Sequence, residues 1–331
     1  MLTDPSGDLV IKPCTQGEVD FYQETVTNHP EFAALMPAFM GTLQLGKSKQ
    51  LVDTIQAAEI QEGQSTLDVP ATDEIPNVSA GFEDPVATFR GKPLDTELAI
   101  VLENVAAGFV KPNILDVKLG KRLWADDAPL AKRSRFDKIA SETTTSSLGF
   151  RIAGMKIWKS DAYHIYDKWY GRSRTIEDVS EAFEELFDLK PEDRDVDVFE
   201  EVVDGIVEAV DEVEQAIAGQ ETRMYSSSLL FIYEGDRAAR REALESACNS
   251  AKAQDSVTSI PAMVADDDHD NEEDDEAQQV PSKKIFDIRV IDFAHATWTP
   301  GQGPDENMLS GIRNVQHILR TMANNSRRTT E

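Results

Sequence analysis

Residues 112 to 120 read Pro-Asn-Ile-Leu-Asp-Val-Lys-Leu-Gly, and their side chains alternate in the way that a half-buried β-strand requires. In an extended chain, one face carries Leu115, Val117 and Leu119, and the opposite face carries Ile114, Asp116 and Lys118. Burying a carboxylate and an ammonium group without ligands is costly, so the polar face is expected to look into a cleft. A carboxylate that can hold a sugar hydroxyl, next to a cation that can hold a phosphate, suits phosphoryl transfer to a polyol. The spacing alone is equally compatible with a surface ion pair on a strand.

The composition is that of a globular chain that stays in a reducing compartment. With 331 residues, 40% of them hydrophobic, the chain can form one large or two modest domains around a packed core. No run approaches the roughly 18 apolar residues of a transmembrane segment, and residues 1–13 do not resemble a signal peptide. Only Cys14 and Cys248 are present, so no disulfide framework is expected, and the nucleus and cytoplasm are the expected locations.

The charge of the chain is unevenly distributed. The formal net charge is −28, yet residues 111–174 hold fourteen Lys and Arg against seven Asp and Glu, a local excess of +7. Because screening at physiological salt acts over about 8 Å, distant acidic segments have little effect on a ligand bound in this region. The excess favours a small phosphate-rich ligand, although the same cations could simply pair with acidic neighbours. The overall acidity argues against direct nucleic acid binding and against anionic membranes.

The first part of the chain is expected to form a small, mainly β lobe over residues 1–106. Strands are expected at Leu9–Ile11, Phe39–Leu45 and Glu97–Val105, with a helix over Glu18–Thr27. Residues 46–93 show no sustained periodicity and are rich in polar residues, Pro and Gly, so they are expected to be a disordered insertion.

Residues 107–331 are expected to form a larger α+β lobe. Strands are expected at Tyr225–Tyr233 and Ile285–Phe293, and the last helix should begin near Asp305, a residue suited to the N-cap. The strongest helical pattern covers Val198–Ala218, where an apolar stripe faces a side of Asp and Glu that is expected to be solvated. Nine acids among the eleven residues of Asp266–Glu276 predict a disordered acidic loop, about residues 250–282, which could alternatively dock basic partners.

Three motifs in a fixed order give the chain a resemblance to a known family. Pro112, Asp116, Lys118 and Gly120 match the Pro-x-x-x-Asp-x-Lys-x-Gly motif of the inositol polyphosphate kinases, and Ser226–Leu230 and Ile291–His295 are similar to two further motifs of that family. Within the family the chain is most similar to the inositol polyphosphate multikinases of fungi. The resemblance implies a two-lobed α+β fold, distantly like that of protein kinases, with ATP bound between the lobes.

The resemblance assigns nucleotide-binding roles to six positions. Lys12 would hold the α- and β-phosphates, Glu18 would orient Lys12, and Thr3–Gly7 would supply the turn that covers the phosphates. The remaining candidates are Glu103 and Val105, whose main-chain groups would bind adenine, Asp116 for the ribose hydroxyls, and Ser228 near the phosphates or metal.

The resemblance also assigns metal- and acceptor-binding roles. Asp292 ends an apolar strand face, where a carboxylate needs a partner or a metal, and the family counterpart holds Mg2+. Lys118 would bridge the γ-phosphate and the inositol phosphate and stabilise charge in the transition state. His295 would face the acceptor. The helix expected after the first motif carries the basic residues Lys132, Arg133, Arg135 and Lys138. The resemblance implies that basic residues of this segment contact the acceptor phosphates, and Arg135 and Lys138 are the candidates chosen among them.

Together these positions imply an ATP- and Mg2+-dependent kinase that acts on soluble inositol polyphosphates. The multikinase resemblance implies the tris- and tetrakisphosphate as acceptors, at the 3- and 6-hydroxyls. A related inositol trisphosphate or hexakisphosphate kinase is the rival enzyme. A protein kinase is disfavoured, because the chain has no His-Arg-Asp catalytic loop. A different class of function is a nuclear regulatory scaffold that binds transcriptional regulators through the acidic loop.

Overall fold

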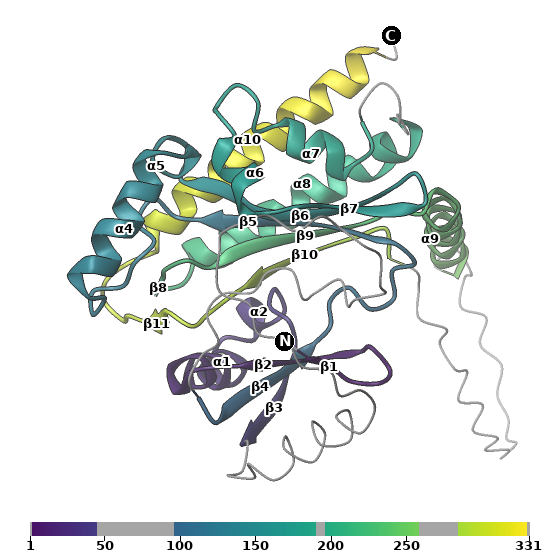
Figure 1. Ribbon diagram of the computed structural model, residues 1–331. Coiled ribbons are helices and arrows are strands. Elements are labelled where there is room, and N and C mark those ends of the chain that lie inside the picture. The colour runs from purple at the N-terminus through teal and green to yellow at the C-terminus, as the bar shows by residue number, and fades with distance from the viewer. Residues whose placement is uncertain (1, 45–95, 190–195, 258–283, 330–331) are drawn as a thin grey trace, which may run out of the picture.

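The computed structural model describes residues 2–44, 96–189, 196–257 and 284–329, and these residues form a small lobe and a large lobe (Figure 1). The small lobe is an antiparallel sheet of four strands in the order β1-β2-β4-β3, with two helices packed beside it. Its elements are β1 (Leu2–Thr3), β2 (Leu9–Pro13), α1 (Gln16–Asn28), α2 (Pro30–Ala33), β3 (Phe39–Gln44) and β4 (Leu98–Glu103).

The large lobe is built on an antiparallel sheet of five strands in the order β10-β9-β5-β6-β7. Its central strand, β5 (Pro112–Leu119), is the alternating segment, and every second residue from Asn113 to Leu119 is buried. The other strands of this sheet are β6 (Phe150–Lys159), β7 (Ala162–Tyr166), β9 (Ser228–Glu234) and β10 (Phe286–Ile291). A separate two-stranded sheet pairs β8 (Thr222–Met224) with β11 (Ala296–Trp298).

Seven helices of the described chain pack around the large sheet. They are α4 (Leu130–Ser141), α5 (Thr144–Leu148), α6 (Lys168–Ser173), α7 (Glu181–Leu186), α8 (Val196–Ala218), α9 (Arg237–Val257) and α10 (Glu306–Thr329). In Figure 1, α8 and α10 run side by side on the face of the sheet that points away from the small lobe. Among the described residues, no helix is both long and apolar enough to cross a membrane.

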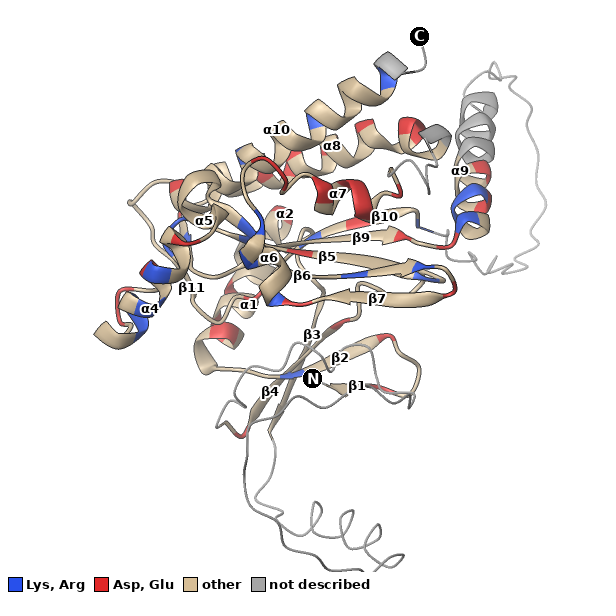
Figure 2. Cartoon of the chain, turned by 45° about the horizontal axis from the view of Figure 1, so that its top comes forward, with Lys and Arg blue, Asp and Glu red and all other residues tan. Residues whose placement is uncertain are grey.

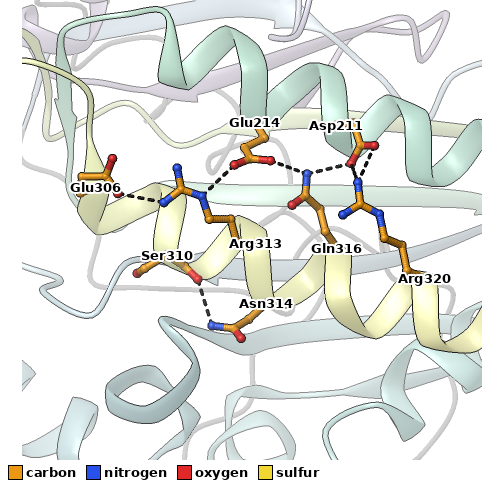
Figure 3. Close-up of polar contacts among 8 residues, drawn as sticks. All are labelled: Asp211, Glu214, Glu306, Ser310, Arg313, Asn314, Gln316 and Arg320. Carbon is orange, nitrogen blue, oxygen red and sulfur yellow. Dashed lines mark hydrogen bonds and ion pairs between the residues drawn. The ribbon is translucent and has the colours of Figure 1, made fainter.

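Helix α8 buries the apolar stripe that its sequence predicts. Phe199, Val203, Ile206, Val210, Val213 and Ile217 are fully buried in the core. Its acidic side is not wholly solvated, because α10 supplies cations to part of it (Figure 3). Arg313 donates to Glu214 at 2.7 Å, and Arg320 donates to both carboxylate oxygens of Asp211 at 2.7 Å.

Aromatic rings join the two lobes directly. Phe21 of α1 stacks on Phe293 and on Trp298, with ring centroids 5.1 Å and 5.5 Å apart, and Tyr22 meets Phe293 edge-on at 5.3 Å. The ring of Phe32, in α2, also meets Phe293 edge-on. These rings belong to one continuous hydrophobic core that includes residues of both lobes.

Main-chain contacts strengthen the same junction. The amide of Val290, on the edge strand β10, donates to the carbonyl oxygen of Leu35 at 2.8 Å. The guanidinium of Arg289 donates to the carbonyl oxygens of Ala34 and Met36, the residues before and after Leu35. The segment after α2 is therefore bonded to the large sheet along its edge.

The structure corrects two expected boundaries. The strand expected from Tyr225 begins at Ser228. Ser226 has a left-handed φ of 61°, and the amide of Tyr225 donates to the carbonyl oxygen of His295 instead of to a residue of the large sheet. The acidic loop expected from about residue 250 cannot begin there, because α9 continues to Val257. The rest of that loop, including Asp266–Glu276, and the insertion expected over residues 46–93 lie outside the described residues.

Candidate functional site

An ion-pair network at the junction of the lobes contains Lys12 from β2. Its ammonium group donates to Glu18 and to Asp292, both at 2.9 Å. Glu18 lies in the first turn of α1, whose N-cap Thr15 accepts a hydrogen bond from the Glu18 amide, and the Glu18 side chain is buried. Burial opposes the charge on Lys12, but the carboxylates of Asp292 and Glu18 outweigh it and raise the pKa of the ammonium group. Lys12 therefore carries a fixed positive charge at the lobe boundary.

Asp292 lies one residue beyond β10 and not within the strand. Its φ of 67° is left-handed, so its side chain leaves the alternation of the strand and turns towards the two lysines. Ser227 supports this turn by donating to the Asp292 carbonyl oxygen at 2.9 Å. Although burial acts to raise the pKa of Asp292, Lys12 and Lys118 lower it to about 2, and 40% of the side chain remains exposed. The result is an ionised, accessible carboxylate.

Lys118 and Asp116 lie on the same face of β5, as the alternation predicts. The Lys118 ammonium donates to the Ser226 carbonyl oxygen at 2.5 Å and lies 3.8 Å from the Asp292 carboxylate. Burial raises the pKa of Asp116, while Lys118 acts to lower it. One carboxylate oxygen of Asp116 is buried without a hydrogen-bond partner in the described part of the chain, and the hydroxyl of Ser228 is buried beside this carboxylate and acts to lower its pKa. Such polar atoms are uncommon in folded proteins and often mark functional sites.

The link between the lobes begins at Glu103, the last residue of β4. The Glu103 amide donates to the carbonyl oxygen of Ala38 at 2.9 Å, so its carbonyl oxygen is the main-chain group that could meet an adenine. Asn104 holds the turn between β1 and β2, through its side chain to the Gly7 carbonyl and its amide to the Asp8 carbonyl, both at 2.7 Å. Val105 is buried in a small apolar cluster with Phe109 and Ile232.

The far end of this link is fixed by a buried carboxylate. Glu234, at the end of β9, accepts hydrogen bonds from the amides of Val110 at 2.6 Å and Lys111 at 2.8 Å. The following residue, Gly235, lies so close to the Lys111 carbonyl oxygen that a Cβ would come within 2.6 Å of it. The role of Glu234 could not be predicted from the sequence, because a carboxylate at a strand end is also typical of an exposed turn.

At the other end of the network, His295 contacts Lys132 of α4, which was not chosen among the predicted acceptor ligands. The Lys132 ammonium of α4 lies 3.0 Å from His295 Nε2. Burial and then Lys132 lower the pKa of His295, which favours a neutral ring whose Nε2 accepts from the lysine. Lys132 lies one helical turn before the partly buried Phe136.

The two α4 residues that the sequence favoured do not join this network. Lys138 is largely exposed and pairs with Glu142 at 3.8 Å, one turn further along α4. Arg135 is exposed and lies over the ring of Phe136. Helix α4 has no buried residue, so its weak amphipathic pattern could not show which side faces the site. In Figure 2, Lys and Arg gather on α4 and around α6, while α7 carries acidic residues.

The site offers one carboxylate to a divalent cation. Within the described ranges, no group of three or more His, Cys, Asp or Glu could enclose a metal ion. Mg2+ is commonly bound by one or two carboxylates together with the phosphates of a nucleotide. Asp292, ionised and partly exposed beside two lysines, fits that mode of binding.

Comparisons with known proteins agree on one family. A family model described as "Inositol polyphosphate kinase" matches residues 99–320. The inositol polyphosphate multikinase of Saccharomyces cerevisiae is 32% identical over 351 residues, covering 96% of this chain and 94% of that protein. Inositol hexakisphosphate kinase 3 of Mus musculus is 30% identical over 231 residues, covering 67% of this chain and 50% of that protein. The crystal structure of the S. cerevisiae inositol phosphate multikinase with ADP and Mn2+ matches with a TM-score of 0.61 and 28% identity, covering 96% of this chain and 99% of that one.

Proposed function

Because the chain belongs to the inositol polyphosphate kinase family, we propose that it transfers the γ-phosphoryl group of Mg-ATP to hydroxyl groups of soluble inositol polyphosphates. The family and the two-lobed α+β fold that the three sequence motifs imply are confirmed. The chain is therefore a kinase, and the proposal concerns its substrates, its metal and the roles of its residues.

The observation that carries the proposal is the network of Lys12, Lys118 and Asp292. The two lysines come from different lobes, and both approach one carboxylate, at 2.9 Å and 3.8 Å. Phosphoryl transfer depends mainly on positioning and on neutralising the charge of the phosphates, so two cations beside a metal-binding carboxylate suit it. The solved relative that binds ADP and Mn2+ supports the same assignment.

Each residue then has a defined task. Lys12, held by Glu18, binds the α- and β-phosphates, Asp292 binds the divalent cation, and Lys118 binds the γ-phosphate as charge develops on it. When bound, Mg2+ neutralises phosphate charge and aligns the leaving and accepting oxygens. Asp116, with its unpartnered oxygen, accepts from the ribose hydroxyls, and Ser228 lies beside the phosphates. Glu103 and Val105 present main-chain groups to the adenine.

We place the acceptor at the end of the site where Lys118, His295 and Lys132 meet. The contact of Lys132 with His295 supports this position. It brings Lys132 of α4, in addition to Lys118 of β5, towards the phosphoryl group that is transferred. Arg135 and Lys138 remain further candidates for acceptor contacts, since their ammonium and guanidinium groups are exposed on the same helix. The tris- and tetrakisphosphate are the proposed acceptors, at the 3- and 6-hydroxyls.

The direct test is incubation of the purified chain with ATP, Mg2+ and a panel of inositol phosphates, followed by separation of the products. We expect the tris- and tetrakisphosphate to be consumed, with little turnover of the hexakisphosphate. Preferred turnover of the hexakisphosphate would favour the rival kinase, and turnover of none of them would contradict the proposal. A parallel reaction with Mn2+ in place of Mg2+ would show which cation supports activity.

We also propose that the chain works in the nucleus and cytoplasm and that residues 266–276 contact transcriptional regulators. The supporting feature is the concentration of nine acids in eleven residues, which favours basic partners. Deleting residues 266–276 should leave turnover of inositol trisphosphate unchanged while abolishing binding to such regulators. A large loss of turnover would show that the segment takes part in catalysis.

A further inference from the structure

Arg151 on β6 lies next to the proposed site, but the roles assigned above do not use it. In the antiparallel pairing of β5 with β6, Arg151 is directly opposite Lys118, so both side chains lie on the same face of the sheet. Only 8% of Arg151 is exposed. A guanidinium group is therefore buried immediately beside the lysine that is proposed to hold the transferring phosphate.

The buried guanidinium lacks a matching anion. Asp116 is the carboxylate that acts on Arg151, but the two form no direct ion pair in the described chain, and Nη1 of Arg151 is buried without a hydrogen-bond partner there. Burial and then the neighbouring Arg172 lower the pKa of Arg151 to about 10, while Asp116 acts in the opposite direction. Burying a charge with incomplete pairing is costly, so the site favours the arrival of an anion.

Arg172 brings a second guanidinium close enough to lower the pKa of Arg151, and this guanidinium also lies over the ring of Trp169, 4.9 Å from its centroid. Arg172 belongs to α6, which lies against β6 so closely that a Cβ on Gly171 would come within 1.9 Å of the Ile152 carbonyl oxygen. The Nε of Arg172 is also buried without a partner within the described chain. By contrast, Arg174, two residues later, pairs with Asp178 and Glu181, each at 3.5 Å. Of these two arginines, Arg172 is the one without a carboxylate.

The strand order separates these arginines from the metal-binding carboxylate. In the sheet, β9 and β10 lie on one side of β5, and β6 lies on the other. Asp292 follows β10, so the proposed metal site lies on the β9–β10 side of β5, and Arg151 lies on the β6 side. Arg151 is also opposite Lys118, two residues beyond Asp116 in the direction away from the link between the lobes. This position corresponds to the acceptor and not to the adenine or ribose.

We propose that Arg151 and Arg172 form a phosphate-binding subsite that receives a phosphate already present on the acceptor. The planar guanidinium group binds phosphate through paired hydrogen bonds, and two such groups beside Lys118 would hold a phosphate-rich ring in a fixed orientation. The subsite rests on the proposed function, since it names the part of the acceptor that these residues bind.

The test compares Arg151→Met and Arg172→Met with the unmodified chain in steady-state kinetics and in calorimetric binding of inositol trisphosphate without nucleotide. Hydrogen bonds to charged groups change equilibrium constants by roughly tenfold to a hundredfold. We expect KM and Kd for inositol trisphosphate to rise by that factor in each variant, with KM for ATP changed less than twofold. Arg151→Lys should recover part of the loss, because it restores the charge but not the planar donor set.

Arg320→Met is the matched control, since Arg320 pairs with Asp211 on the far side of the sheet and should leave both KM values unchanged. Unchanged acceptor KM in both methionine variants, or a rise confined to KM for ATP, would overturn the subsite. If Arg151→Met does not fold, Arg172→Met decides, because Arg172 is only partly buried. Absence of any turnover by the unmodified chain would instead contradict the proposed function.

Discussion

Replacing Asp292 by asparagine removes one negative charge from the point where both lysines meet. The carboxylate accepts from Lys12 at 2.9 Å and lies 3.8 Å from Lys118, and asparagine keeps its volume without its charge. Loss of one preorganised electrostatic contact commonly lowers kcat by roughly two to three orders of magnitude. We therefore expect a loss of at least that size in the Asp292→Asn variant, because the proposed metal-binding group and the partner of two lysines are lost together.

The same variant has a second, pH-dependent effect on folding stability. Folding lowers the pKa of Asp292 from 3.8 to about 2, which for a fully buried group would correspond to about 2.4 kcal/mol. Because 40% of the side chain is exposed, solvent screening reduces this contribution to about 1 kcal/mol. The folded pKa is the lower one, so the contribution is present above about pH 4 and disappears as the pH falls towards 2.

Two assays separate these effects. Initial rates with inositol trisphosphate at saturating Mg-ATP measure kcat, and urea unfolding at pH 7 and pH 3 measures the free energy of unfolding. Asp211→Asn is the control, since it makes the same chemical change in an acid of α8 that pairs with Arg320 of α10. A kcat close to that of the unmodified chain, or a loss of rate explained entirely by unfolding, would refute the assignment of Asp292.

Four further substitutions test other parts of the site and core. Lys118→Ala should lower kcat by roughly two to three orders of magnitude with a smaller change in KM for ATP, measured by initial rates. Glu234→Gln should raise KM for ATP several-fold and leave KM for the acceptor unchanged, because two amides of the interlobe link lose their charged acceptor. Lys132→Ala should raise KM for inositol trisphosphate roughly tenfold, and a larger effect from Lys138→Ala would contradict the position of the acceptor. Ile206→Ala, in the buried stripe of α8, should lower the free energy of unfolding by about 2–5 kcal/mol in urea titrations while kcat is retained.

The sequence predicted those features that depend on strong local patterns. The alternation of β5 identified the face that carries Asp116 and Lys118, because apolar residues at every second position fit a strand and not a helix. The apolar stripe of α8 identified its buried side, and the helix expected over Glu18–Thr27 lies within α1, which begins two residues earlier at Gln16. In each of these segments the local preference and the tertiary packing agree.

The features that the sequence did not predict depend on contacts between distant segments. The left-handed turn at Asp292 is supported by Ser227, 65 residues earlier, and nothing near Asp292 in the sequence indicates it. The contact of Lys132 with His295 could not be predicted, because α4 buries no residue and hydrophobic periodicity therefore carried no information about its orientation. Glu234 fixes amides more than 120 residues away, a partnership that spacing along the chain cannot reveal.

The aromatic junction between the lobes has a consequence for how activity is controlled. Helix α1 carries both Glu18 and Phe21, and the ring of Phe21 stacks on Phe293, the residue after Asp292. Moving α1 away from the large lobe would expose the rings of Phe21, Phe293 and Trp298 to water. An open conformation that separates Lys12 from Lys118 is therefore unfavourable. We therefore expect the bond between Lys12 and Asp292 to persist whether or not a nucleotide is bound, so that activity follows the supply of substrates and not a movement of α1.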